Sequence, residues 1–130
     1  MLLTVQTSPG EFLDKLTILE IKSERIQDPE KVANVRRELE LLKVTWAGSP
    51  LATRDVTALT GQLREVNEIL WDVEDRIRLK EAEQRFDADF IELARAVYRT
   101  NDKRAAIKRR INVALGSEIL EEKSYAGSGG

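Results

Sequence analysis

Apolar residues recur at every third or fourth position in several stretches of the chain, and this spacing predicts helices. The most regular stretch keeps the three-four alternation over three heptads and contains Val56, Leu59, Leu63, Val66, Leu70, Val73 and Ile77. It predicts one long helix from Asp55 to about Gln84, which would span about 45 Å at 1.5 Å per residue. A second stretch steps in the same way from Val32 to Trp46. No segment shows the strict apolar-polar alternation that is typical of a strand.

Capping signals mark where the first two helices begin and end. Positions 8–11, Ser-Pro-Gly-Glu, form a capping box that predicts a helix running to about Gln27. Asp28 and Pro29 close this helix and start the next one, because the residue before a proline disfavours helical geometry and Asp is a good cap. The Ala-Gly-Ser-Pro segment at 47–50 ends the second helix.

The last third of the chain carries a weaker helical pattern. Asp87 is a plausible cap for a helix, and apolar residues continue at helical spacing from Phe90 to Leu115 with a polar interval near Asn101. The pattern leaves open whether residues 90–115 form one helix or two. Gly116 predicts a stop, and Ser117 predicts the cap of a short final turn through position 121.

Length and composition place the chain among small all-α proteins. The 130 residues predict a compact antiparallel bundle of four to five helices with one long central helix, as a single domain over 1–125 followed by a flexible Gly/Ser tail at 126–130. The formal net charge is −2, which by itself indicates no particular partner. The absence of Cys and His excludes disulfides, thiolate catalysis, histidine-based triads and the usual zinc sites. Because no signal peptide or membrane-spanning run is evident, we expect a cytoplasmic protein with no membrane segment.

Polar residues interrupt several of the predicted apolar faces. On a helical wheel, Glu20 lies between Leu13 and Leu16 on the apolar face of the first helix, while Ile18 and Ile21 lie on the opposite side. The first helix is therefore expected to be covered on two faces and to be central to the bundle. A carboxylate in such a position needs a partner, because burying an unpaired charge is costly.

Two further polar rows lie on the later helices. Asn67, Trp71, Glu74 and Arg78 step by four, three and four residues beside the heptad stripe, and Asn101, Arg104 and Lys108 continue the apolar stripe of the last helix. We expect these rows to converge with Glu20 between helices, the usual place for a bundle to hold a ligand. The candidate ligand-binding residues are Glu20, Asn67, Trp71, Glu74, Asn101, Arg104 and Lys108.

The same residues allow other interpretations. The carboxylates and basic side chains can instead form a purely structural network, and the two tryptophans can serve only in packing. Helical spacings of acidic residues, such as Glu11 with Asp14, permit a magnesium site, although charge-rich helices produce such spacings freely. The basic run at 103–110 has no interleaved aromatic residue and is followed by acidic ones, so nucleic acid is not an expected partner.

Several segments together resemble a family of short bacterial and viral proteins known as domain of unknown function 6165. The segments carrying this resemblance are Gly10-Glu11-Phe12-Leu13-Asp14-Lys15-Leu16-Thr17-Ile18-Leu19-Glu20-Ile21-Lys22, Asn34-Val35-Arg36-Arg37-Glu38-Leu39, Glu65-Val66-Asn67-Glu68 with Trp71-Asp72, Tyr98-Arg99-Thr100-Asn101-Asp102-Lys103-Arg104, and Glu121-Glu122-Lys123-Ser124-Tyr125. The resemblance covers most of positions 9–125. It implies one compact domain and carries no established activity and no catalytic assignment.

A fainter resemblance is to the all-helical nucleoside triphosphate pyrophosphohydrolases. The pairs Glu65/Glu68 and Asp72/Asp75 and the stretch at 100–103 are similar to their magnesium-binding and phosphate-binding groups. The tight Glu-Glu-x-x-Glu signature of those enzymes is absent from this chain, which weakens the comparison.

These observations favour a protein that binds an anionic, phosphorylated small molecule, such as a nucleotide or nucleotide-sugar, in an interhelical cleft. Arg104 and Lys108 would pair with the phosphate, and Trp71 would form a wall. One alternative is a magnesium-dependent, pyrophosphohydrolase-like enzyme. Another is a coiled-coil-like homodimerisation module that uses the apolar stripe at 56–77.

Overall fold

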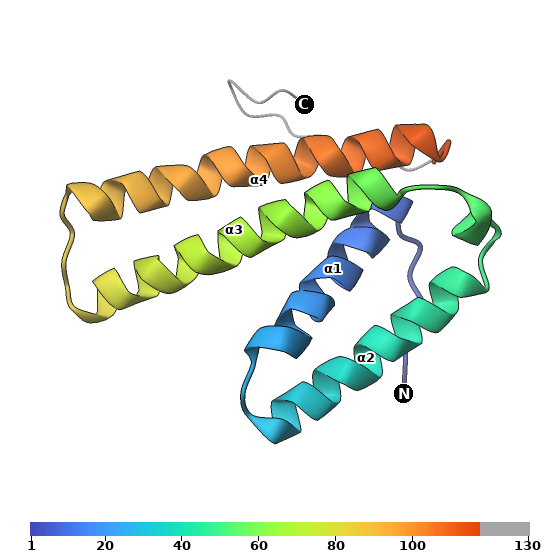
Figure 1. The fold of residues 1–130 in the computed structure, drawn as a ribbon, viewed down its shortest axis with the longest axis horizontal. Helices are drawn as coiled ribbons and strands as arrows, with labels where there is room; N and C mark the ends of the chain where they lie inside the picture. The colour runs from blue at the N-terminus through green and yellow to red at the C-terminus, as the bar shows by residue number, and fades with distance from the viewer. Residues whose placement is uncertain (118–130) are drawn as a thin grey trace.

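The computed structural model describes residues 1–117, and the predicted all-α fold is confirmed for this part of the chain. Four α-helices are present, with a short 3-10 helix between the second and third, and no strand occurs within residues 1–117 (Figure 1). The elements are α1 (Pro9–Arg25), α2 (Pro29–Ala47), η1 (Pro50–Thr53), α3 (Thr57–Ala82) and α4 (Ala88–Ala114). The predicted extent of the domain to position 125 stays a prediction, since residues 118–125 lie outside the described residues.

Three of the predicted helix starts are made by side-chain caps. The Ser8 hydroxyl accepts a hydrogen bond from the Glu11 amide at 3.1 Å, and the Asp28 carboxylate accepts one from the Glu30 amide at 3.0 Å. Asp87 caps α4 by accepting from the Phe90 amide at 3.0 Å. Each cap satisfies a backbone N–H that has no partner within its own helix.

The second long helix, α4, is continuous over 27 residues, so the region at 90–115 forms one helix and not two. Its length is close to that of α3, the long helix predicted from the heptad stripe, which has 26 residues. Gly116 follows α4 with a φ of 66°, the left-handed conformation that commonly stops a helix at glycine. The short turn predicted after Ser117 lies outside the described residues.

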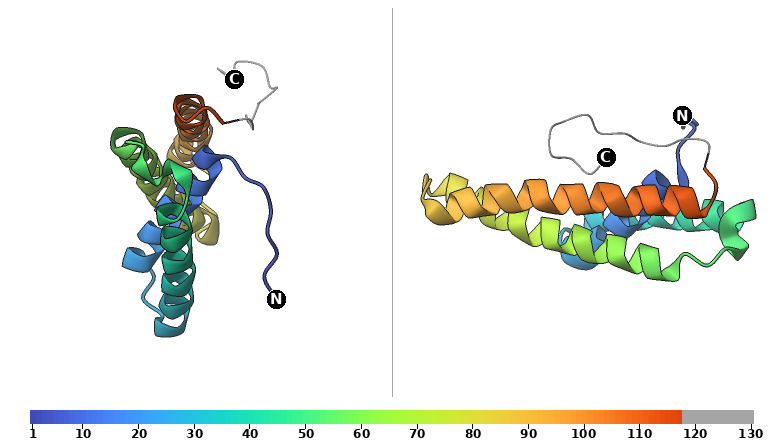
Figure 2. Two further views of the ribbon diagram at one scale, coloured as in Figure 1. Left: turned by 90° about the vertical axis from the view of Figure 1, so that its right-hand side faces the viewer. Right: turned by 90° about the horizontal axis from the view of Figure 1, so that it is seen from above.

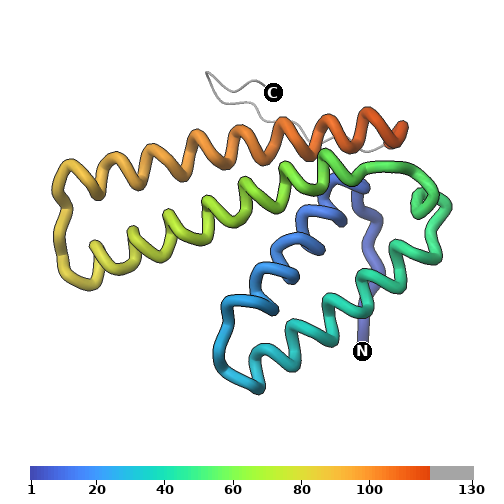
Figure 3. The backbone as a smooth tube through the Cα atoms, in the orientation of Figure 1, coloured from blue at the N-terminus to red at the C-terminus, as the bar shows by residue number. Residues whose placement is uncertain are grey.

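The four helices form two antiparallel hairpins. The α3–α4 hairpin is the longer one, and the α1–α2 hairpin lies obliquely against one end of it (Figures 1 and 3). Helix α1 contacts α2, α3 and α4, whereas α2 contacts only α1 and η1 within the described residues. Figure 2 shows the far end of the α3–α4 pair extending beyond the other two helices. The expectation that the first helix is central is therefore confirmed.

The middle of the heptad stripe of α3 packs in the core formed by this chain's own helices. Leu63, Val66, Leu70 and Val73 are buried, and the first two belong to a core cluster that also contains Leu13, Ile107, Ile111 and Leu115. At the edge of this core, the rings of Phe12 and Trp46 stack with centroids 5.8 Å apart. Because the middle of the stripe is already covered by this chain's own helices, it is not an exposed face for a second copy.

Within residues 1–117, no helix is long and apolar enough to cross a membrane.

The first turn of α1 makes an unusually close approach to α4. The Gly10 amide donates a hydrogen bond to the Asn112 side-chain oxygen at 2.7 Å, and both residues are buried. A Cβ built on Gly10 would lie 2.5 Å from the Lys108 carbonyl oxygen and 2.9 Å from the Asn112 oxygen. Only glycine allows the two backbones to come this close without displacement.

We expect Gly10→Ala to destabilise the protein by about 1–3 kcal/mol, because the added methyl group must push α1 away from α4. Gly61→Ala is the matched control, since a Cβ there meets nothing within 4 Å and α3 gains helix propensity. That control should be neutral or stabilising by up to about 1 kcal/mol. Denaturant unfolding measures both changes, and equal effects of the two substitutions would contradict the close contact.

The turn between α3 and α4 contains a charge pair that should respond to acid. Hydrogen bonding to Lys80, and then to the Phe90 amide, lowers the pKa of Asp87 below its usual 3.8. A lowered pKa contributes stability that is fully present above pH 3.8 and is lost as the pH falls through the folded-state pKa.

Asp87→Asn should therefore reduce the loss of stability below about pH 4, while keeping the helix cap because Asn is also a good capping residue. Thermal unfolding between pH 2 and 6 measures this difference. Asp89→Asn is the control on the same helix, because Asp89 is 81% exposed and approaches Lys80 only to 3.9 Å. If Asp87→Asn loses as much stability below pH 4 as the unmodified protein does, Asp87 is not a source of that loss.

Candidate functional site

A buried carboxylate, Asp14, joins three helices. Its side chain is only 1% exposed and projects from α1 toward α3 and α4. One carboxylate oxygen accepts from the Asn67 amide nitrogen at 2.9 Å and from Arg104 Nε at 2.9 Å, and the other accepts from Arg104 Nη2. The Arg104 pair is thus bidentate, the geometry in which guanidinium and carboxylate groups match best.

Thr17 completes this network from the next turn of α1. Its buried hydroxyl donates to the Asp14 carbonyl oxygen at 2.8 Å and accepts from the Asn67 amide nitrogen at 3.0 Å. Both N–H groups of Asn67 are therefore used, one by Asp14 and one by Thr17. The remaining polar atom of the Asn67 side chain is its carbonyl oxygen, which can act only as an acceptor.

Arg104 is held in the charged state by its surroundings. The hydrogen bonds to Asp14 raise the pKa of Arg104 more than its partial burial lowers it, and Glu11 and Glu74 add smaller favourable contributions. Its side chain remains 28% exposed. Arg104 therefore carries its charge at the boundary between the buried network and solvent.

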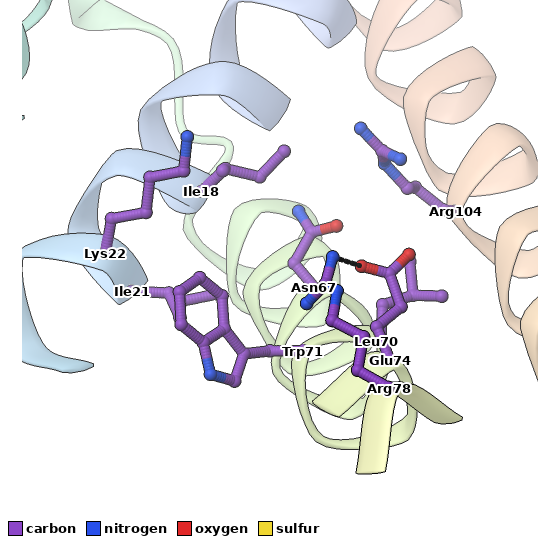
Figure 4. A pocket seen from close by; sticks show the side chains of 9 residues that line it. All are labelled: Ile18, Ile21, Lys22, Asn67, Leu70, Trp71, Glu74, Arg78 and Arg104. Carbon is purple, nitrogen blue, oxygen red and sulfur yellow. Dashed lines mark ion pairs between the residues drawn. The ribbon is translucent and has the colours of Figure 1, made fainter. Parts of the chain in front are cut away.

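An open cleft of about 240 Å³ lies beside this network, between α1, α3 and α4. Figure 4 shows Arg104 reaching across from α4, Lys22 extending from α1, and Asn67, Trp71 and Glu74 on α3. The lining residues are Ile18, Ile21, Lys22, Asn67, Leu70, Trp71, Glu74, Arg78 and Arg104. Apolar side chains from α1 and α3 form its walls, and charged groups lie around them.

The structure brings together four of the seven residues proposed from the sequence. Asn67, Trp71, Glu74 and Arg104 line this cleft, together with Arg78 from the same polar row of α3. Arg78 lies 3.8 Å from Glu74 and 3.5 Å from Asp75. The polar row of α3 therefore does form one wall of a cleft.

The other three residues lie elsewhere. Glu20 lies on the opposite side of α1, 3.3 Å from Arg64, and lines a separate cleft of about 460 Å³ between α1, η1 and α3. Lys108 pairs with Glu11 at 2.5 Å near the start of α1. Asn101 is partly buried but does not line the cleft, because the buried seam of α4 passes through Thr100.

Two important residues of this region, Asp14 and Lys22, were not among the seven ligand-binding candidates, although both lie in the segment at 10–22 that carries the family resemblance. A signal for Asp14 exists in the second face of the first helix, since extending that face from Ile21 toward the N-terminus passes Thr17, Asp14 and Gly10, all of which are buried. Lys22 follows Ile18 by one helical turn and so lies above the same face. Neither residue interrupts the apolar stripe of the first helix, so apolar periodicity alone does not single them out.

Most of the acidic residues that suggested magnesium form ion pairs with basic side chains. Glu68 pairs with Arg64, Asp72 with Arg25, and Asp75 with Arg78. Within residues 1–117, no group of three or more carboxylates gathers closely enough to hold a metal ion. The acidic spacings on α1 and α3 therefore build no preformed metal site in this part of the chain.

Asp14→Asn should destabilise the protein by about 3 kcal/mol, because it leaves the partly buried Arg104 without its counter-charge. Glu38→Gln is the control, since it breaks the exposed Lys15–Glu38 pair at 2.9 Å and should change stability by less than about 1 kcal/mol. Both values come from denaturant unfolding at neutral pH. A loss below about 1 kcal/mol in Asp14→Asn would show that the network does not hold the three helices together.

Comparison with known proteins identifies one family. No curated protein and no solved structure matches this chain significantly. The resemblance to the nucleoside triphosphate pyrophosphohydrolases therefore gains no support. Residues 3–128 match the family of unknown function DUF6165, which is nearly the whole length of the chain. The chain accordingly belongs to the DUF6165 family.

Proposed function

We propose that the cleft between α1, α3 and α4 binds a small anionic molecule, such as a phosphorylated metabolite. The observation that carries this proposal is the position of Lys22. Lys22 lines the cleft, and its ammonium group has no ion-pair partner among residues 1–117. A cation that is partly buried and unpaired is costly to keep unless an anion joins it.

Arg104 supplies a second cation from the opposite side. Because Asp14 occupies Nε and Nη2 of Arg104, the guanidinium orientation is fixed and Nη1 remains as a further donor group. Figure 4 shows Lys22 and Arg104 on either side of the cleft, with Asn67 between them in this view. A preorganised guanidinium and a mobile ammonium are both common binders of phosphate oxygens.

The size of the cleft limits the ligand. A volume of about 240 Å³ is below the roughly 300–1,000 Å³ typical of sites for drug-sized molecules. It favours a molecule the size of a small phosphate ester over a complete nucleotide-sugar. Trp71 and Leu70 offer an apolar wall for the non-phosphate part.

The two alternative functions have less support. A magnesium-dependent hydrolase needs grouped carboxylates, and those of α3 pair with arginines. A dimer through the heptad stripe needs that stripe on the surface, and Leu63, Val66, Leu70 and Val73 are buried within the chain. The cleft combines a cation that has no ion-pair partner within residues 1–117 with an apolar wall.

Lys22→Gln should weaken binding of a small phosphate ester at least tenfold. It should leave the melting temperature unchanged or slightly raised, since Lys22 makes no ion pair within residues 1–117 and its partly buried charge is removed. Arg104 is a poorer test because its removal also unpairs Asp14. Isothermal titration calorimetry with glycerol phosphate, ethyl phosphate and nucleoside monophosphates provides the measurement.

Lys15→Gln is the matched control, because Lys15 lies on the same helix, is exposed and pairs with Glu38 away from the cleft. Its affinity for the phosphate esters should equal that of the unmodified protein. The proposal fails if the unmodified protein binds none of these anions, or if both lysine variants bind them equally well.

A further inference from the structure

The polar groups of the cleft are divided into donors and acceptors. Lys22 and Arg104 can only donate, whereas Asn67 presents its carbonyl oxygen because both of its N–H groups are used by Asp14 and Thr17. This amide orientation follows from its partners, since the Asp14 carboxylate only accepts and the Thr17 hydroxyl already donates to a backbone oxygen. The cleft therefore offers an acceptor beside Lys22 and Arg104.

Glu74 provides a second acceptor two turns further along α3. Its carboxylate is 47% exposed, and the nearest cation, Arg78, lies at 3.8 Å and is itself 73% exposed. Such a long, solvated pair holds a carboxylate only weakly. Glu74 can therefore turn to a ligand group without breaking a strong interaction.

The charges around the cleft balance. Three cations line it, namely Lys22, Arg78 and Arg104, and three carboxylates accompany them, namely Glu74 in the lining and Asp75 and Asp14 paired to the two arginines. If the ligand carried only negative charge, the cleft together with its ligand would have a net negative charge. A ligand that carries both signs would keep it neutral and would satisfy Glu74 as well as Lys22.

We propose that the ligand is a zwitterion, in which an anionic group and an ammonium group are separated by a short carbon chain. The anionic group lies against Lys22 and Arg104, and the ammonium group donates to the Asn67 oxygen and the Glu74 carboxylate. The carbon chain packs on the apolar wall formed by Ile18, Ile21 and Trp71. This inference rests on the proposed function, because it adds a positive group to the same bound anion.

Two kinds of molecule share this chemistry, the aminoalkyl phosphates and the amino acids. They are distinguished by pairs of probes that differ only in the amino group. O-Phosphoethanolamine with ethyl phosphate tests the phosphate kind, and 4-aminobutanoate with butanoate tests the carboxylate kind. Calorimetric titration of the full chain with all four compounds gives the affinities directly.

In at least one pair, the amino compound should bind at least tenfold more tightly than its partner. Glu74→Gln should abolish this preference, because Gln offers no charge to the ammonium group, and the affinity for the compound without the amino group should not fall, because a negative charge beside the bound anion is removed. Glu65→Gln is the matched control, because Glu65 is exposed on α3 and does not line the cleft. It should keep the full preference.

The outcomes separate the two proposals. Equal binding within both pairs would overturn the zwitterion and leave anion binding standing, whereas no binding of any of the four compounds would count against both. A preference for the amino compound that survives in Glu74→Gln would overturn the recognition of an ammonium group by Glu74. A preference in the phosphate pair alone, or in the carboxylate pair alone, supports the inference and identifies the kind of anion.

Discussion

The arrangement of the helices depends on one buried carboxylate. Removing Asp14 from water costs several kcal/mol, and this cost is offset only because both of its oxygens accept charge-assisted or amide hydrogen bonds. Its partners come from α3 and α4, so the interaction is complete only when α1 packs against both of these helices. A purely apolar contact would tolerate rotation and sliding of α1, whereas this network accepts one orientation.

The same network shapes the cleft at its border. Asp14 accepts hydrogen bonds from two donor groups of Arg104 and one of Asn67, and Thr17 accepts one more from Asn67. These bonds determine which polar atoms of Arg104 and Asn67 remain available on the open side. The structure therefore supports the structural interpretation of the polar seam, and the proposed ligand binding would use other atoms of the same residues. The inner atoms join the helices, and the outer atoms remain available on the side of the cleft.

Much of the fold could be predicted from local signals. The caps at Ser8, Asp28 and Asp87 and the heptad stripe of α3 act within one or two turns, so their consequences are visible in the sequence itself. The α3 row of the site was predicted for the same reason. Glu20 was placed with it because a helical wheel shows which side chains share a face, but not which neighbouring helix covers that face.

The remaining site residues depend on how helices cross. Asp14 and Lys22 are unremarkable charged residues in a charge-rich helix, and only the oblique packing of α1 buries one and exposes the other to the cleft. Asn101 shows the opposite case, because α4 stays continuous and its seam passes through Thr100. Sequence periodicity cannot distinguish a polar residue in the seam from one immediately beside it.

The position of α1 also has a consequence for how the chain assembles. The contacts that join its N-terminal half to α4 link residues 90 and 102 positions apart, in the Asp14–Arg104 and Gly10–Asn112 pairs. The α3–α4 and α1–α2 hairpins close over much shorter loops, which is entropically easier. The helix at the centre of the structure is thus synthesised before α2, α3 and α4, and its contacts with α4 require nearly the whole described chain to have been synthesised.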